Sequence, residues 1–111
     1  MSRSKKSNTT EEMAKEEQSA FQDIINVFCS TTEEEEMRAL FDDLFTASEV
    51  KDLITRWLLM DDLYKGKPQR EIAEARKLSL CKITRGSKML KKEDGFMHRL
   101  LSERYDDHLH I

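Results

Sequence analysis

The sequence predicts an all-α fold, and three observations favour it. Apolar side chains recur at steps of three and four residues along most of the chain, which places them on one face of a helix. Glycine occurs only three times and proline once, so the residues that most often interrupt helices are scarce. No segment alternates apolar and polar residues as a half-buried strand would. A chain of 111 residues is long enough for one compact domain, which we expect over residues 15–105.

The first half of the chain predicts two helices after a polar arm. Residues 1–14 offer no apolar face to bury, so we expect a disordered N-terminal arm there. An apolar stripe after Ala20 predicts a first helix that ends near Ser30. Thr32 and Glu35 have the spacing of a capping box, in which the hydroxyl and the carboxylate each bind a free backbone amide. A second, short helix should therefore follow Thr32.

A third helix is predicted over about 47–65 and is the longest of the set. Thr46 and Glu49 repeat the capping-box spacing before it, and Gly66 supplies a left-handed stop after it. Residues 57–60 are apolar nearly all round the helix. Such a helix is buried on several sides or shared between two chains. With 38% hydrophobic and 37% charged residues, the composition is lean for a small monomer, and burial in a dimer would relieve this.

The segment 68–91 has the spacing of a helix-turn-helix, which places its second helix in the major groove of DNA. Pro68 opens the first helix, since its fixed φ suits a first turn, and Ser79 is a good N-cap for a second helix over 80–91. Four apolar residues are expected to face inward: Ile72, Ala73, Leu78 and Ile83. The exposed half of the second helix then presents Leu80, Cys81, Lys82, Thr84 and Arg85. Beyond Gly95, a last helix is predicted to about residue 105, with a frayed tail over 106–111.

Charge is distributed unevenly along the chain. The whole chain carries −3, but residues 65–92 contain ten basic and two acidic residues, a local charge of +8 that leaves −11 for the rest. A basic segment on an acidic body attracts a polyanion to one face and disfavours the other faces. The coincidence of this segment with the helix-turn-helix favours nucleic acid as the partner. The alternatives are an unevenly charged solvated surface and a helical hairpin that only packs against the core.

Three sequence elements together resemble the Trp repressor family. They are QRE at residues 69–71, TRGS at residues 84–87, and the pattern LxTRxxxxxxLxxG from Leu53 to Gly66. The resemblance covers about residues 20–105 and implies an intertwined homodimer of six-helix subunits. It implies a repressor of tryptophan-related operons that binds double-stranded operator DNA. L-tryptophan would act as corepressor by orienting the DNA-reading helices, and no other cofactor is implied.

The resemblance also implies a corepressor pocket. Its residues correspond to Thr46, Arg56, Arg85, Gly86 and Met89, with backbone carbonyls near Asp43 and Phe45 of the second subunit. Two guanidinium planes suit a flat indole through stacking and cation–π contact, and one guanidinium can also hold the carboxylate. Gly86 would leave room for the ring. The alternative for the two arginines is a role in phosphate contacts or weak surface salt bridges.

Some positions depart from the family pattern. Met89 replaces a serine that assists the amino group of the ligand, and a thioether is only a weak acceptor. Tryptophan would then bind less tightly, or the effector would be a related indole. Arg76 and Lys77 replace leucine and glycine in the turn, so Lys77 is expected to adopt a left-handed conformation. The loop between the third and fourth helices is one residue shorter.

For DNA, the resemblance makes Arg70 the first candidate for a base contact, because a guanidinium matches the two acceptors of guanine. The residues placed to contact phosphates or water-bridged bases are Gln69, Lys82, Thr84, Ser87 and Lys91. Lys88 and Lys92 would add nonspecific attraction. Lys82 replaces a threonine of the family, so the preferred operator can differ.

Other functions have little support in the sequence. No Ser/His/Asp group, phosphate loop or zinc-ligand spacing occurs, so we expect neither an enzyme nor a metal site. The three histidines are expected to be surface or partly packed residues: His98, His108 and His110. Cys29 and Cys81 are too far apart for a CxxC motif. With no apolar run near the roughly 20 residues needed to span a bilayer and no signal-peptide pattern, we expect a cytoplasmic protein without membrane contact.

Two further hypotheses stay open. The first, motivated by Met89 and Lys82, is a regulator of the same fold that responds to another indole-like effector or to none. The second is a helical interaction module that binds a protein through the apolar helix over 47–65 and does not bind DNA.

Overall fold

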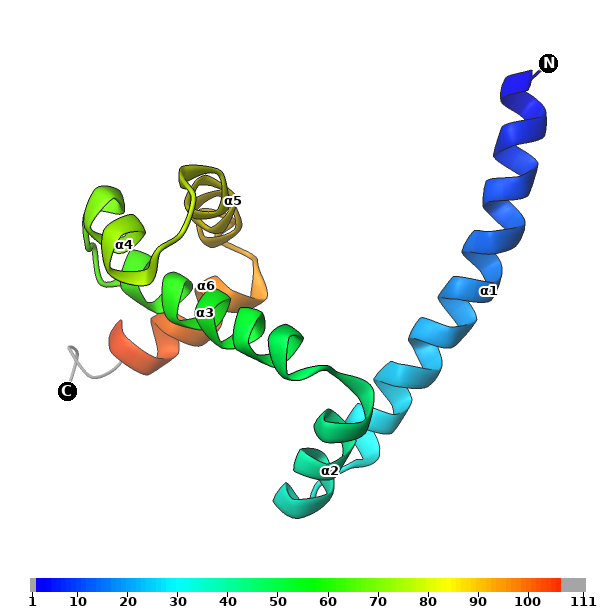
Figure 1. Cartoon of the computed structure of the whole chain (residues 1–111), viewed down its shortest axis with the longest axis horizontal. Helices are drawn as coiled ribbons and strands as arrows, with labels where there is room; N and C mark the ends of the chain where they lie inside the picture. The colour runs from blue at the N-terminus through cyan, green and yellow to red at the C-terminus, as the bar shows by residue number, and fades with distance from the viewer. Residues whose placement is uncertain (1, 107–111) are drawn as a thin grey trace. The chain divides into compact units, whose positions relative to one another are not determined.

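The computed structural model describes the backbone of residues 2–106 and the side chains of residues 14–106. Every regular element in this part of the chain is a helix, which confirms the predicted all-helical fold (Figure 1). The helices form two compact units, Met1–Phe45 and Thr46–Ile111. The single domain predicted over 15–105 spans both units and stays a prediction.

The first unit consists of α1, Ser2–Ser30, and α2, Glu34–Leu44. Aromatic rings link the end of α1 to α2, because the ring centroids of Phe28 and Phe41 lie 5.8 Å apart. None of the described side chains in this unit is fully buried. On α1, the apolar residues Phe21, Ile24, Ile25 and Val27 are all exposed. The end of α1 at Ser30 agrees with the apolar stripe, but that stripe lacks cover within the described part of this unit.

The start of each helix in the first unit differs from the expectation. The backbone is helical from Ser2, whereas residues 1–14 were expected to form a disordered arm. Strong helix formers from Glu11 to Gln18 favour continuation of α1 in that direction. The prediction of a capping box at Thr32 is wrong, because the N-cap of α2 is Glu33 and no side chain caps the helix with a hydrogen bond. Three carboxylates in the first turn of α2 favour this later start through the helix dipole.

The second unit is built around α3, Ala47–Tyr64, which contacts α4, α5 and α6 (Figure 1). With 18 residues, α3 is shorter than α1 with 29, so the expectation that it is the longest helix is wrong. Its predicted capping box is confirmed: the Thr46 hydroxyl accepts from the Glu49 amide at 3.1 Å, and the Glu49 carboxylate accepts from the Thr46 amide at 2.9 Å. Gly66 has a φ of 83°, as the left-handed stop requires. Trp57 is 42% exposed, so the described residues cover only part of this apolar helix.

The helix-turn-helix consists of α4, Gln69–Arg76, and α5, Leu80–Leu90. Pro68 is the N-cap of α4, so the helix begins one residue after the proline that was expected to open it. Lys77 ends α4 at φ 55° and ψ 49°, which confirms the left-handed turn. The Ser79 hydroxyl accepts from the amide of Lys82 at 3.3 Å and so caps α5 as predicted.

The core of the second unit joins the two helices of this motif to α3. Leu59, Ile72 and Ile83 are buried together, and Leu63, Ala73 and Leu78 pack against them. The four inward residues predicted for the helix-turn-helix are therefore confirmed.

The chain then forms α6, Phe96–Leu101, and a π-helical segment, Ser102–Asp106. Leu101 is fully buried. Asp106 accepts hydrogen bonds from the Tyr64 hydroxyl at 2.5 Å and from the Ser102 hydroxyl at 3.2 Å. The last helix thus agrees with the prediction, and residues 107–111 of the expected tail lie outside the described residues. No helix in the described residues is both long and apolar enough to cross a membrane.

Candidate nucleic-acid interface and ligand pocket

The candidate DNA-reading helix is α5, which is anchored by one face and exposed on the other. Ile83 and Gly86 are buried against the body of the unit. Five predicted residues are exposed on this helix: Leu80, Cys81, Lys82, Thr84 and Arg85. The Thr84 hydroxyl donates to the Leu80 carbonyl at 2.8 Å, so its hydrogen is already bonded within the helix. The structure therefore places these five residues on the N-terminal half of one helix.

The other residues predicted to contact DNA lie outside that half of α5. Gln69 and Arg70 begin α4, and both are exposed. Ser87 is half-buried on α5, and Lys91 is exposed just after its end. Arg70 is thus available to a partner, as a base contact requires.

A buried carboxylate, which the sequence analysis did not single out, holds α4 against α3. Asp62 is only 4% exposed. One of its oxygens accepts from Nε of Arg76 at 2.6 Å, and the other lies 3.2 Å from Nζ of Lys67. The hydrogen bond from Arg76 lowers the pKa of Asp62; burial opposes this lowering, and Lys67 adds to it. Arg76, a departure from the family pattern, therefore has a structural role at the joint between α3 and the helix-turn-helix.

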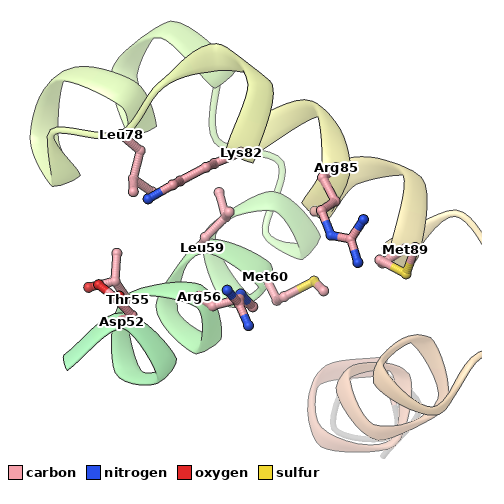
Figure 2. Close-up of a pocket in the computed structure, with 10 residues that line it drawn as sticks. Asp52, Thr55, Arg56, Leu59, Met60, Leu78, Lys82, Arg85 and Met89 are labelled. Carbon is pink, nitrogen blue, oxygen red and sulfur yellow. The ribbon is translucent and has the colours of Figure 1, made fainter. Parts of the chain in front are cut away.

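A pocket of about 120 Å³ lies between α3 and α5, within the second unit (Figure 2). From α3 it is lined by Asp52, Thr55, Arg56, Leu59 and Met60. From the turn and α5 it is lined by Leu78, Lys82, Arg85, Gly86 and Met89. The structure thus brings together four of the predicted ligand residues: Arg56, Arg85, Gly86 and Met89.

The pocket combines positive charge with apolar surface. The guanidinium groups of Arg56 and Arg85 come from the two facing helices, with the thioethers of Met60 and Met89 beside them (Figure 2). Guanidinium planes stack on aromatic rings and bind carboxylates, and methionine adapts to irregular apolar surfaces. Such a wall can bind a flat aromatic acid.

Gly86 has a packing role in addition to the predicted one. A Cβ at this position would lie 3.1 Å from Cδ2 of Leu59 and 3.4 Å from Cδ1 of Leu63. Its missing side chain therefore lets α5 approach α3 closely. The room expected for a ligand ring is partly taken by Leu59.

Three predicted ligand residues do not line this pocket. Thr46 is the N-cap of α3, and its hydroxyl is bonded to the Glu49 amide. Asp43 and Phe45 belong to the end of the first unit. Conversely, sequence reasoning missed six lining residues: Asp52, Thr55, Leu59, Met60, Leu78 and Lys82. Helical spacing could have indicated Asp52 and Leu59, which lie three or four residues to either side of Arg56.

The described residues provide no alternative centre for metal chemistry. No cluster of three or more potential metal ligands occurs among them. His98 is half-buried and its Nδ1 lies 3.1 Å from the Leu90 carbonyl oxygen, whereas His108 and His110 lie outside the described residues.

A helical unit whose core unites a helix-turn-helix with its supporting helix defines the class of the protein: a small helix-turn-helix protein. The family model described as "Trp repressor protein" matches residues 19–104. The chain therefore belongs to the Trp repressor family, which confirms the resemblance seen in the sequence. Members of this family are transcription regulators rather than enzymes.

Two relatives illustrate the similarity. A "Trp operon repressor homolog" of Xylella fastidiosa strain M23 is 34% identical over 86 residues, which cover 75% of this chain and 94% of the relative. A protein of the same description from Chlamydia trachomatis serovar D is 35% identical over 83 residues, which cover 74% of this chain and 88% of the relative. No solved structure matches the chain significantly.

Proposed function

We propose that this protein is a DNA-binding repressor of tryptophan-related operons and that L-tryptophan raises its affinity for operator DNA. The observation that carries this proposal is the pocket, in which Arg56 of α3 faces the same space as Arg85 of α5. Because α5 is also the candidate reading helix, a ligand between these arginines would contact both the body and the helix. Ligand binding would then fix the orientation of α5.

In the proposed complex, the indole ring lies between Arg56 and Arg85, and one guanidinium holds the carboxylate. The backbone carbonyls of Asp43 and Phe45 would come from a second copy of the chain and, together with Thr46, bind the polar end of the ligand. This arrangement requires a homodimer. The exposed apolar residues of each unit, such as Ile25 and Trp57, support one because a second copy could cover them.

For the DNA complex, we propose that the N-terminal half of α5 enters a major groove and that Arg70 contacts a base edge. Lys82, Thr84, Ser87 and Lys91 would contact phosphates or water-bridged bases, with Gln69 beside Arg70, while Leu80 and Cys81 would face the groove. The acidic balance outside residues 65–92 would disfavour DNA contact elsewhere. Such a regulator would act in the cytoplasm, where it meets the operator.

The proposal is tested by selecting bound sequences from random duplex DNA with and without L-tryptophan and then titrating the selected operator. We expect tighter binding with the ligand, and a large fall in affinity for Arg70→Ala. Tight binding unaffected by tryptophan would remove the corepressor role. Unchanged binding by Arg70→Ala and Lys82→Ala would instead favour the helical interaction module.

A second candidate is favoured by Met89, whose thioether lines the pocket. It is a regulator of the same fold that responds to another indole-like effector or to none. Calorimetry with tryptophan and with indole analogues lacking the amino group separates the two candidates. If tryptophan is the effector, Met89→Ser should strengthen its binding by restoring a hydroxyl acceptor.

A further inference from the structure

Lys82 belongs both to the exposed half of α5 and to the wall of the pocket. From the sequence, only a DNA contact was expected of it. In the structure its side chain extends along the pocket, which Leu78 also lines (Figure 2). The ion pairs among the described residues use Arg38, Lys65, Lys67 and Arg76 as cations, so none of them neutralises Lys82.

Charge in the pocket disfavours this position of the ammonium group. Arg56, Arg85 and Lys82 contribute three cations to the lining, and Asp52 contributes the one carboxylate. Like charges that share a pocket repel each other, and apolar lining residues such as Leu78 offer the ammonium no hydrogen bond. Little therefore holds the end of the Lys82 side chain inside.

The size of the pocket points to the same side chain. A cavity of about 150 Å³ accommodates a single benzene ring, and this pocket measures about 120 Å³. A fused aromatic ligand is larger than this space, so it either extends out of the open side of the pocket or displaces a lining side chain. Leu59 and Met60 are buried in the core. Lys82 is exposed on a flexible four-carbon stem, so it can withdraw without opening the core.

We infer that an aromatic carboxylate larger than one ring, on entering this pocket, displaces the Lys82 ammonium to the exposed face of α5, where it gains a contact with a DNA phosphate. The inference rests on the proposed function and names the side chain that links its two sites. The ligand would thus do more than orient α5, because it would also add one positive charge to the DNA-binding surface.

The salt dependence of operator binding tests this inference. Each phosphate contact steepens the slope of log affinity against log salt concentration by about 0.9. Operator affinity is measured over a series of KCl concentrations, with saturating L-tryptophan and without it. For the unsubstituted protein we expect the slope with ligand to be steeper by about 0.9 for each Lys82 that reaches a phosphate. Lys82→Arg should retain this difference, and Lys82→Ala should abolish it.

Lys88→Ala is the matched control, because Lys88 is an exposed cation of the same helix that does not line the pocket. It should change the slope equally with and without ligand. A ligand-dependent difference that persists in Lys82→Ala, or equal slopes in the unsubstituted protein, would overturn the inference while leaving the repressor proposal intact. If tryptophan has no effect on operator affinity in the unsubstituted protein, the corepressor role fails, and this inference fails with it.

Discussion

The two units of the chain differ in how their apolar side chains are covered. All fully buried residues among the described side chains lie in the second unit, between Leu59 and Leu101. The first unit leaves residues such as Phe21 and Ile25 exposed. A helix with an uncovered apolar stripe gains little stability from its own sequence. The second unit therefore carries most of the apolar burial that one chain supplies, whereas the first would gain stability from the proposed second copy.

The largest expected effect tests this division directly. Ile83 is fully buried, and Ile83→Ala should lower the free energy of unfolding by about 3 kcal/mol at every protein concentration. Ile25→Ala, at a position 39% exposed, should cost less, with a loss that grows as the protein is concentrated and a second copy covers α1. Urea unfolding at several concentrations measures both. Equal losses for the two variants would remove the distinction between the units.

A smaller effect is expected in the second unit, where loss of a pocket arginine should weaken the binding free energy of the proposed ligand by about 2 kcal/mol. Arg85→Ala removes a stacking plane and a charge from the pocket, so the affinity for L-tryptophan should fall about 30-fold. Arg38→Ala in the first unit is the control, because Arg38 pairs with Glu34 on an exposed helix face. Calorimetry measures both affinities. A similar loss in the two variants would show that the arginine of the pocket has no special role.

Arg76→Leu should lower the free energy of unfolding by about 1 to 2 kcal/mol, because it leaves the buried carboxylate of Asp62 with Lys67 as its remaining cation partner. Stability should also depend on pH, because the folded-state pKa of Asp62 lies below its ordinary value of 3.8. Its contribution is present above about pH 3.8 and is lost as pH falls through the lower folded-state pKa.

Thermal unfolding at a series of acidic pH values checks this dependence. Asp62→Asn should weaken the decline of the unfolding temperature as the pH falls. Glu34→Gln, which changes an exposed pair of the first unit, should leave the decline as it is. An unaltered acid profile in Asp62→Asn would contradict the assigned role of this carboxylate.

The smallest expected effect is a gain in stability. Lys77 holds a φ of 55°, and glycine adopts such a backbone without steric cost. Lys77→Gly should therefore raise the free energy of unfolding by about 0.5 to 1 kcal/mol. Lys91 provides the comparison, because it is also a lysine at a helix C-cap but has a φ of −74°. Lys91→Gly should be neutral or destabilising, and a gain there as large as at position 77 would refute the explanation.

The sequence predicted best those features that neighbouring residues decide. The capping box of Thr46, the cap by Ser79 and the left-handed Lys77 each depend on a few adjacent residues, and all three are present. Thr32 carries the same capping signature as Thr46, yet it does not cap α2. The exact start of that helix also depends on the turn that leaves α1, where the Thr31 hydroxyl donates to the Val27 carbonyl at 2.6 Å.

Features that depend on distant residues were not predictable in this way. Asp62 reads in the sequence as an ordinary helical acid, and its burial follows from the packing of Arg76, 14 residues later, against α3. The pocket was anticipated through Arg56 and Arg85, which the family motif marks. Its other walls, such as Met60 and Leu78, depend on how closely α5 approaches α3. The sequence pattern of either helix does not indicate how closely the two helices approach.

The contact between Gly86 and Leu59 makes the angle of α5 sensitive to a single methyl group. A Cβ at position 86 would require Leu59 or the helix to shift by a few tenths of an ångström. Where the helix and not Leu59 shifts, a rotation about this contact is magnified along the helix axis toward its exposed N-terminal end. In the proposed symmetric dimer, the shift would occur in both chains, so the distance between the N-terminal ends of the two α5 helices would change by up to twice as much. A substitution at position 86, which lies away from the DNA, would then alter how well these two ends match successive major grooves.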